Sequence, residues 1–240
     1  QVLKQLSILV PEGHEFTVEA GRPDSVNPVK LRSMLELGVN RISINPQTMQ
    51  DDILRRIGRG HSARDIDELL QYVKANTSLA VNMDFIAGLP HQTMQNMVEN
   101  MDYVCQNLPE NVTIHTLALK RGSLLYDLNM QDDIPEEHLV AEMVQYGKER
   151  LEAAGYVPYY LYRQQYMKGQ LENIGYTLPG KACEYNIQIM EERQTIMSMG
   201  PGGSSKWMRA PLYRQKKQHM PKDVDVYIDT LTTLLDKRHA

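Results

Sequence analysis

The chain has 240 residues, of which 42% are hydrophobic and 23% are charged, and this is the composition of an ordinary globular protein. Its formal net charge is −4, which gives no electrostatic reason to expect a nucleic-acid partner. Two cysteines far apart in the sequence exclude a disulfide framework, and no apolar run reaches membrane length, so a cytoplasmic protein is expected.

The hydrophobic pattern alternates between strand-like and helix-like segments as far as residue 155. Glycine, proline and capping residues mark most boundaries, and Ser62 and Thr93 each stand where a helix should begin. In chain order we expect helices over 2–9, 28–37, 49–57, 63–75, 93–107 and 135–154, and strands over 15–20, 40–44, 80–86 and 111–118.

Strand–helix units recur four times between residues 15 and 150, which is the sequence pattern of a parallel α/β architecture. Right-handed crossovers place the loops that follow the four strands on one face. Four units form an open sheet or part of a barrel, and we expect the missing strands upstream of Gln1, which is not a natural start residue. An unpaired sheet edge there would favour association between chains.

The composition changes after residue 155. We therefore expect residues 1–150 to form an incomplete barrel domain and residues 151–240 a separate C-terminal α+β domain. Several tyrosines gather between Tyr156 and Tyr176, which is typical of the core and rim of a β extension. Further along, we expect a strand over 195–199, a glycine-rich turn and a last helix over 222–237.

Polar side chains lie at or near the ends of the predicted strands. Asp84 interrupts an apolar strand, and a charge in that position needs a partner. Glu19 and Gln47 stand at two other strand ends, Ala118 ends the fourth strand, and Arg59 lies in a loop nearby. Such a set suits a polar metabolite with an amine, a ribose and a carboxylate. Each residue also has a structural alternative, as a salt-bridged strand end, a loop cap or part of a solvated basic surface.

Five segments point to a known family, namely VEAGRP, RISINPQ, IGRGH, NMDFIAGLPHQT and SMGPGGSS. With them the chain resembles, over nearly its whole length, the oxygen-independent coproporphyrinogen III oxidases of the radical S-adenosylmethionine (SAM) superfamily. The resemblance implies part of a (β/α)6 barrel that uses SAM and a [4Fe–4S] cluster. It implies oxidative decarboxylation of two propionates of coproporphyrinogen III to vinyl groups, which gives protoporphyrinogen IX. The implied partners are this tetrapyrrole substrate and an electron donor.

The resemblance also implies which residues bind SAM. They come from the strand ends, one loop and a C-terminal turn, and they are Glu19, Gln47, Arg59, Asp84, Ala118 and Ser204. Glu19 would bind the ribose or the amino-acid part, and Ala118 would contact the adenine. No catalytic residue is assigned, and Tyr162, Arg163 and Glu172 are candidates for the rim or for contacts with the substrate propionates.

Two features of the superfamily are absent from this chain, the three-cysteine motif that ligates the cluster and the glycine-rich loop after the second strand. Both belong to units upstream of Gln1, so the chain is interpreted as a fragment. We expect the isolated chain to ligate no metal, to bind SAM weakly and to be inactive.

Two alternatives stay open. One is a related heme chaperone, although the segment from Tyr185 to Gln188 fits the Arg-Asn-x-Gln pattern of the dehydrogenases better than the His-Asn-x-x-Tyr-Trp pattern of the chaperones. The other is a metabolite-binding α/β domain without radical chemistry, because the cluster motif is not in this sequence.

Overall fold

The computed structural model describes residues 1–118, 133–163, 171–209 and 214–239. Their contacts divide the chain into two compact units, Gln1–Cys183 and Glu184–Ala240. The first unit carries a large mixed sheet and most of the helices, and the second carries a small hairpin with two helices.

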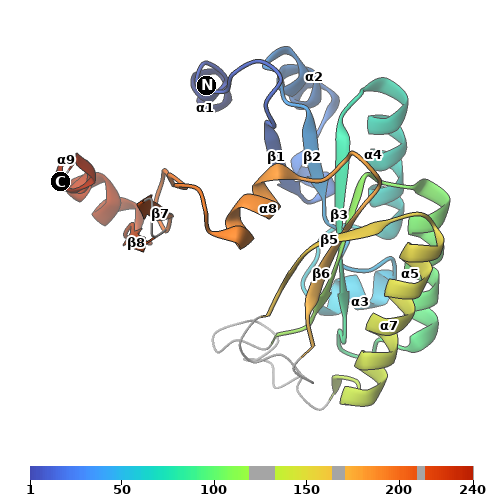
Figure 1. Ribbon diagram of the computed structural model, residues 1–240. Coiled ribbons are helices and arrows are strands. Elements are labelled where there is room, and N and C mark those ends of the chain that lie inside the picture. The colour runs from blue at the N-terminus through green and yellow to red at the C-terminus, as the bar shows by residue number, and fades with distance from the viewer. Residues whose placement is uncertain (119–132, 164–170, 210–213, 240) are drawn as a thin grey trace. The chain divides into compact units, whose positions relative to one another are not determined.

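The first unit is built on a six-stranded sheet in the order β1-β2-β3-β4-β6-β5 (Figure 1). Its first four strands are parallel, and they are β1 (Thr17–Gly21), β2 (Arg41–Ile44), β3 (Ala80–Ala87) and β4 (Asn111–Thr116). The parallel α/β prediction is confirmed. The sheet does not close, with β1 and β5 as its edges, as expected for an incomplete barrel. Association through an edge stays a prediction.

The helices of this unit are α1 (Val2–Ser7), the 3-10 helix η1 (Pro23–Ser25), α2 (Pro28–Glu36), α3 (Asp51–Arg56), α4 (Ala63–Asn76), α5 (Met94–Asn107) and α7 (Glu137–Ala153). Ser62 and Thr93 form capping boxes at the starts of α4 and α5, as their positions predicted. Within the described residues, no helix is long and apolar enough to cross a membrane.

One face of the sheet is apolar and packs against helices. It is formed by alternate residues of β2, β3 and β4, and Ile42, Val81, Met83, Phe85, Val112 and Ile114 are buried there. Figure 1 shows α4, α5 and α7 along this side of the sheet. Helix α7 approaches β4 closely at Gly147, where an added Cβ would lie 2.4 Å from Ile114 Cδ1.

Two antiparallel strands extend the sheet beyond β4. Strand β6 (Asn173–Thr177) pairs with β4, and β5 (Val157–Tyr162) pairs with β6. The tyrosine-rich segment is therefore a β extension, as its composition indicated. The compact unit continues to Cys183, past the boundary expected at residue 150, because β6 takes its hydrogen bonds from β4.

The second unit contains α8 (Glu184–Glu191), an antiparallel hairpin of β7 (Ser204–Arg209) and β8 (Arg214–His219), and α9 (Val224–His239). The strand predicted over 195–199 is wrong, because only Ile196 pairs there, in a single bridge to Lys206. The partner that β7 uses along its length is β8. The turn before β7 contains two glycines in the left-handed region, Gly200 with φ 96° and Gly202 with φ 73°.

Candidate functional site

The face of the sheet opposite the helix-packed layer is polar. Strand register places Glu19 beside Ser43, and Asp84 beside Thr113. In a parallel sheet, paired residues project to the same face, so strands β1 to β4 contribute one continuous row of polar side chains. His115 lies two residues beyond Thr113 on the same face of β4. The carboxyl ends of these strands are where α/β folds bind their ligands.

Glu19 is held by its neighbour on β2. The Ser43 hydroxyl donates a hydrogen bond of 2.9 Å to Glu19 Oε1. Partial burial raises the pKa of Glu19 above its usual value, and the negative charge of Asp84 acts in the same direction, while Ser43 and Asn45 oppose the rise. Because Asp84 affects Glu19 in this way, the two carboxylates belong to one electrostatic site.

Gln47 links the loop after β2 to β3. Its backbone N–H donates to the Asp84 carbonyl at 2.9 Å, and its own carbonyl accepts from Ile86 N at 2.9 Å. Gln47 has a φ of 70°, in the left-handed region that non-glycine residues seldom adopt. Backbone strain of this kind persists where the surroundings enforce it and gathers at functional sites. The strained residue thus lies directly beside Asp84.

Asp84 belongs to a chain of three polar side chains on β3, β4 and β5. His115 Nε2 lies 3.6 Å from Asp84 Oδ1, and the other ring nitrogen, Nδ1, lies 3.1 Å from the Tyr162 hydroxyl. The Asp84 and His115 side chains are about a quarter exposed, so a ligand on this face can reach them. Sequence analysis named Asp84 and Tyr162 but missed His115, which its alternation with Asn111 and Thr113 along β4 could have indicated.

Tyr160 completes the polar face on the side of the antiparallel strands. Its hydroxyl lies 2.9 Å from Thr113 Oγ1, and its ring is parallel to that of Tyr162, with centroids 6.3 Å apart. Burial raises the pKa of Tyr160, and the charge of Asp84 contributes to the rise. The ring crosses β6 at Gly175, where an added Cβ would lie 1.8 Å from Tyr160 Cε1. A glycine is therefore required beneath this tyrosine.

The other end of the polar face is closed by Arg41. Its guanidinium pairs with Glu15 at 3.2 Å and donates to Asn82 Oδ1 at 2.9 Å and to Asn111. It also donates to the carbonyls of Lys181 and Ala182 at 3.0 and 3.1 Å. These contacts lie at the amino ends of β2 and β4, whereas the candidate residues lie toward the carboxyl ends.

The structure thus brings Glu19, Gln47 and Asp84 together. Arg59 lies in the loop after α3, where burial lowers the pKa of its guanidinium and the nearby charges of Arg22 and Asp24 act in opposite directions.

The remaining sequence candidates lie in three other places. Ala118 lies two residues beyond the end of β4. Ser204 is the first residue of β7 in the second unit. The rim candidates Arg163 and Glu172 form an ion pair of 3.0 Å with each other.

The side chains of this chain do not fit an iron–sulfur cluster, which is held by several cysteine thiolates. The sequence contains only two cysteines, and the Cys183 thiol donates to Glu15 Oε1 at 3.2 Å. In the part of the chain that the structure describes, no three His, Cys, Asp or Glu side chains gather in a metal-binding group. Glu19 and Asp84 do offer acceptors to a ligand with hydroxyl and ammonium groups.

Comparison with known proteins gives a consistent family. The family model of the radical SAM superfamily matches residues 2–104. The chain is 36% identical over 224 residues to the oxygen-independent coproporphyrinogen-III oxidase-like protein HemZ of Bacillus subtilis. The aligned region covers 93% of this chain and 45% of HemZ. It is 29% identical over 143 residues to the heme chaperone HemW of the same organism, covering 59% of this chain and 38% of HemW. The chain spans less than half the length of these relatives.

Among solved structures, the chain resembles coproporphyrinogen III oxidase (HemN) from Escherichia coli, described as a radical SAM enzyme. The TM-score is 0.72 over 97% of this chain and 52% of HemN, with 16% sequence identity. This likeness supports the fold, an open sheet of the radical SAM type, and it agrees with the expectation of a partial barrel.

Proposed function

The chain belongs to the radical SAM superfamily, among relatives that include coproporphyrinogen-III oxidase-like proteins and heme chaperones, and we propose that its polar sheet face binds SAM. The observation that carries the proposal is the meeting of Glu19, Gln47 and Asp84 at the carboxyl ends of three adjacent strands. We further propose that the complete protein is a cytoplasmic oxidoreductase that decarboxylates two propionates of coproporphyrinogen III to give protoporphyrinogen IX.

In this proposal the cofactors supply the radical chemistry, and the residues of this chain bind and orient. Glu19 and Asp84 accept hydrogen bonds from hydroxyl or ammonium groups of SAM. Gln47 fixes the backbone beside Asp84, and His115 holds the Asp84 carboxylate from the other side. Arg59 and Ala118 keep the places that the family resemblance implies, with Arg59 completing the SAM pocket and Ala118 contacting the adenine.

The similarity to heme chaperones supports a second candidate function, in which the protein binds heme and does not alter it chemically. The two candidates differ in one assay. The complete protein, with its cluster reconstituted under anaerobic conditions, is given coproporphyrinogen III, SAM and a one-electron donor. A molar amount of vinyl product greater than the molar amount of protein, which requires more than one turnover, supports the oxidoreductase function. Stoichiometric binding of hemin without any decarboxylation supports the chaperone and contradicts the proposed reaction.

A further inference from the structure

A pocket lies in the first unit between η1, the start of α2 and the exposed flank of α4. It has a volume of about 500 Å³, which is within the usual range for small-molecule sites. None of Glu19, Gln47, Arg59, Asp84 and Ala118 lines it.

His61 is the most unusual group in this pocket. The residue is only 7% exposed, and within the described ranges neither ring nitrogen has a hydrogen-bond partner. Buried polar side chains in native proteins nearly always have a partner, and leaving one without costs about 1–3 kcal/mol. Burial lowers the pKa of His61, and the charge of Arg59 adds to this effect, so the ring is neutral at neutral pH. A neutral imidazole has one nitrogen that accepts a hydrogen bond.

Carboxylates lie at the end of the pocket where His61 lies. The lining there includes Asp24 and Asp65, while the guanidiniums of Arg22 and Arg59 act on His61 from outside the lining. Glu68, which also lines the pocket, is already paired with Arg64 at 2.7 Å. Hydrogen bonds from the backbone and hydroxyl of Ser62 to Asp65 Oδ2, both of 2.7 Å, lower the pKa of Asp65 and keep it ionised. Both bonds use Oδ2, so Oδ1 of Asp65 can accept a hydrogen bond from a ligand.

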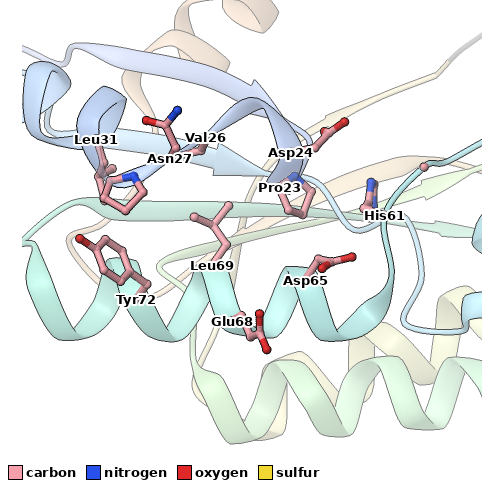
Figure 2. A pocket seen from close by; sticks show the side chains of 12 residues that line it. Pro23, Asp24, Val26, Asn27, Leu31, His61, Asp65, Glu68, Leu69 and Tyr72 are labelled. Carbon is pink, nitrogen blue, oxygen red and sulfur yellow. The ribbon is translucent and has the colours of Figure 1, made fainter.

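The two ends of the pocket differ in polarity. Figure 2 shows His61, Asp24 and Asp65 at one end, and Leu31 and Tyr72 at the other, with Leu69 between them. A ligand that satisfies both ends needs a positively charged head and an apolar body. A simple metal ion satisfies only the first requirement.

We propose that this pocket binds a small organic ammonium ion with an apolar or aromatic body. The ammonium group donates to the unprotonated nitrogen of His61 and lies between the carboxylates of Asp24 and Asp65. The apolar body lies against Leu31 and Leu69, and the Tyr72 ring stacks against its far end.

The test uses benzylamine as the probe and benzyl alcohol as its neutral counterpart of similar shape. Binding to the purified chain is measured by calorimetry, and the His61 ring signals are followed by NMR. We expect benzylamine to bind at least about tenfold more tightly than benzyl alcohol and to shift the His61 signals. Equal affinities for the two probes, or His61 signals that do not move, would overturn the proposal.

Three variants sharpen the test. Asp24→Asn should weaken benzylamine binding about three- to tenfold and leave benzyl alcohol unaffected. Asp52→Asn is the matched control, because Asp52 is exposed and outside the pocket, and it should change neither affinity. His61→Phe keeps a ring of similar size and should abolish the preference for the amine. If that variant does not fold, an Asp24→Asn affinity equal to that of Asp52→Asn still contradicts the proposal.

Discussion

His115 Nε2 on β4 lies 3.6 Å from Asp84 Oδ1 on β3, and the opposite ring nitrogen faces the Tyr162 hydroxyl on β5. The 3.6 Å separation is longer than a hydrogen bond, but an N–H on Nε2 turns its positive end toward the Asp84 carboxylate, while Nδ1 accepts a hydrogen bond from Tyr162. The antiparallel strand β5 thereby fixes the ring that positions Asp84.

The first prediction concerns this tautomer. Nitrogen-15 NMR of the imidazole should show the proton of the neutral ring on Nε2. Tyr162→Phe removes the donor to Nδ1 and should give a mixture of the two tautomers, while Tyr159→Phe serves as the control on the same strand. A predominant Nδ1–H form in the unchanged chain would mean that the roles assigned to Asp84 and Tyr162 are reversed.

The second prediction concerns pH. The pKa of Glu19 is raised in the folded state, so folding favours the protonated side chain. The contribution of Glu19 to stability is therefore fully present below pH 4.5, its ordinary pKa, and is lost as pH rises through the folded pKa. Glu19→Gln mimics the protonated side chain and can still accept from Ser43. Urea denaturation should find the variant equal to the parent below about pH 4.5 and more stable at neutral pH. A variant that is less stable at neutral pH would show that Glu19 is a stabilising ion and not a group held for a ligand.

The third prediction concerns the glycine beneath Tyr160. Gly175→Ala places a Cβ within the tyrosine ring, so the ring or β6 must move, and we expect a loss of about 1–3 kcal/mol of stability. Gly60→Ala is the control, because a Cβ there meets no atom within 4 Å. In a Tyr160→Ala background the Gly175→Ala cost should largely disappear. An unchanged cost in that background would place the clash elsewhere.

The fourth prediction concerns Arg41, whose side chain is 8% exposed and pairs with a Glu15 side chain that is 12% exposed. Arg41→Ala should lower the free energy of unfolding by about 3–5 kcal/mol, because it leaves a poorly solvated carboxylate behind. Arg64→Ala breaks a pair on the surface of α4, with side chains 85% and 60% exposed, and should cost less than about 0.5 kcal/mol. Similar losses in the two variants would show that the Arg41 cluster does not hold the amino ends of the strands together.

The parallel part of the fold could be predicted because each of its elements is marked locally. The strands are short apolar runs, and the capping residues Ser62 and Thr93 mark the starts of α4 and α5. The antiparallel extension is not marked in this way, because β5 and β6 depend on pairing with the distant strand β4. The strand predicted over 195–199 was wrong for the same reason. Its apolar residues suggested a paired strand, but β7 pairs along its length with β8, and only Ile196 bridges to Lys206.

The residues of the candidate site also differ in how far the sequence marks them. Asp84 could be found because a carboxylate in an apolar strand is conspicuous in the sequence. Alternation along β4 could have indicated the face on which His115 lies, but not its partner Asp84 or the pairing of Tyr160 with Thr113, because these neighbours meet only through sheet register. The strained φ of Gln47 has no signature in the residue type and required the folded backbone.

The most direct test of the proposed SAM site is the affinity of the complete protein for SAM after Asp84→Asn, with the melting temperature measured on the same samples. The change keeps the size of the side chain and removes its charge, so we predict binding weaker by about ten- to hundredfold. Asp52→Asn, an exposed change on α3, is the matched control and should leave the affinity unaltered. Unchanged SAM affinity in Asp84→Asn, accompanied by a lower melting temperature, would contradict the account and make Asp84 a structural residue of the sheet.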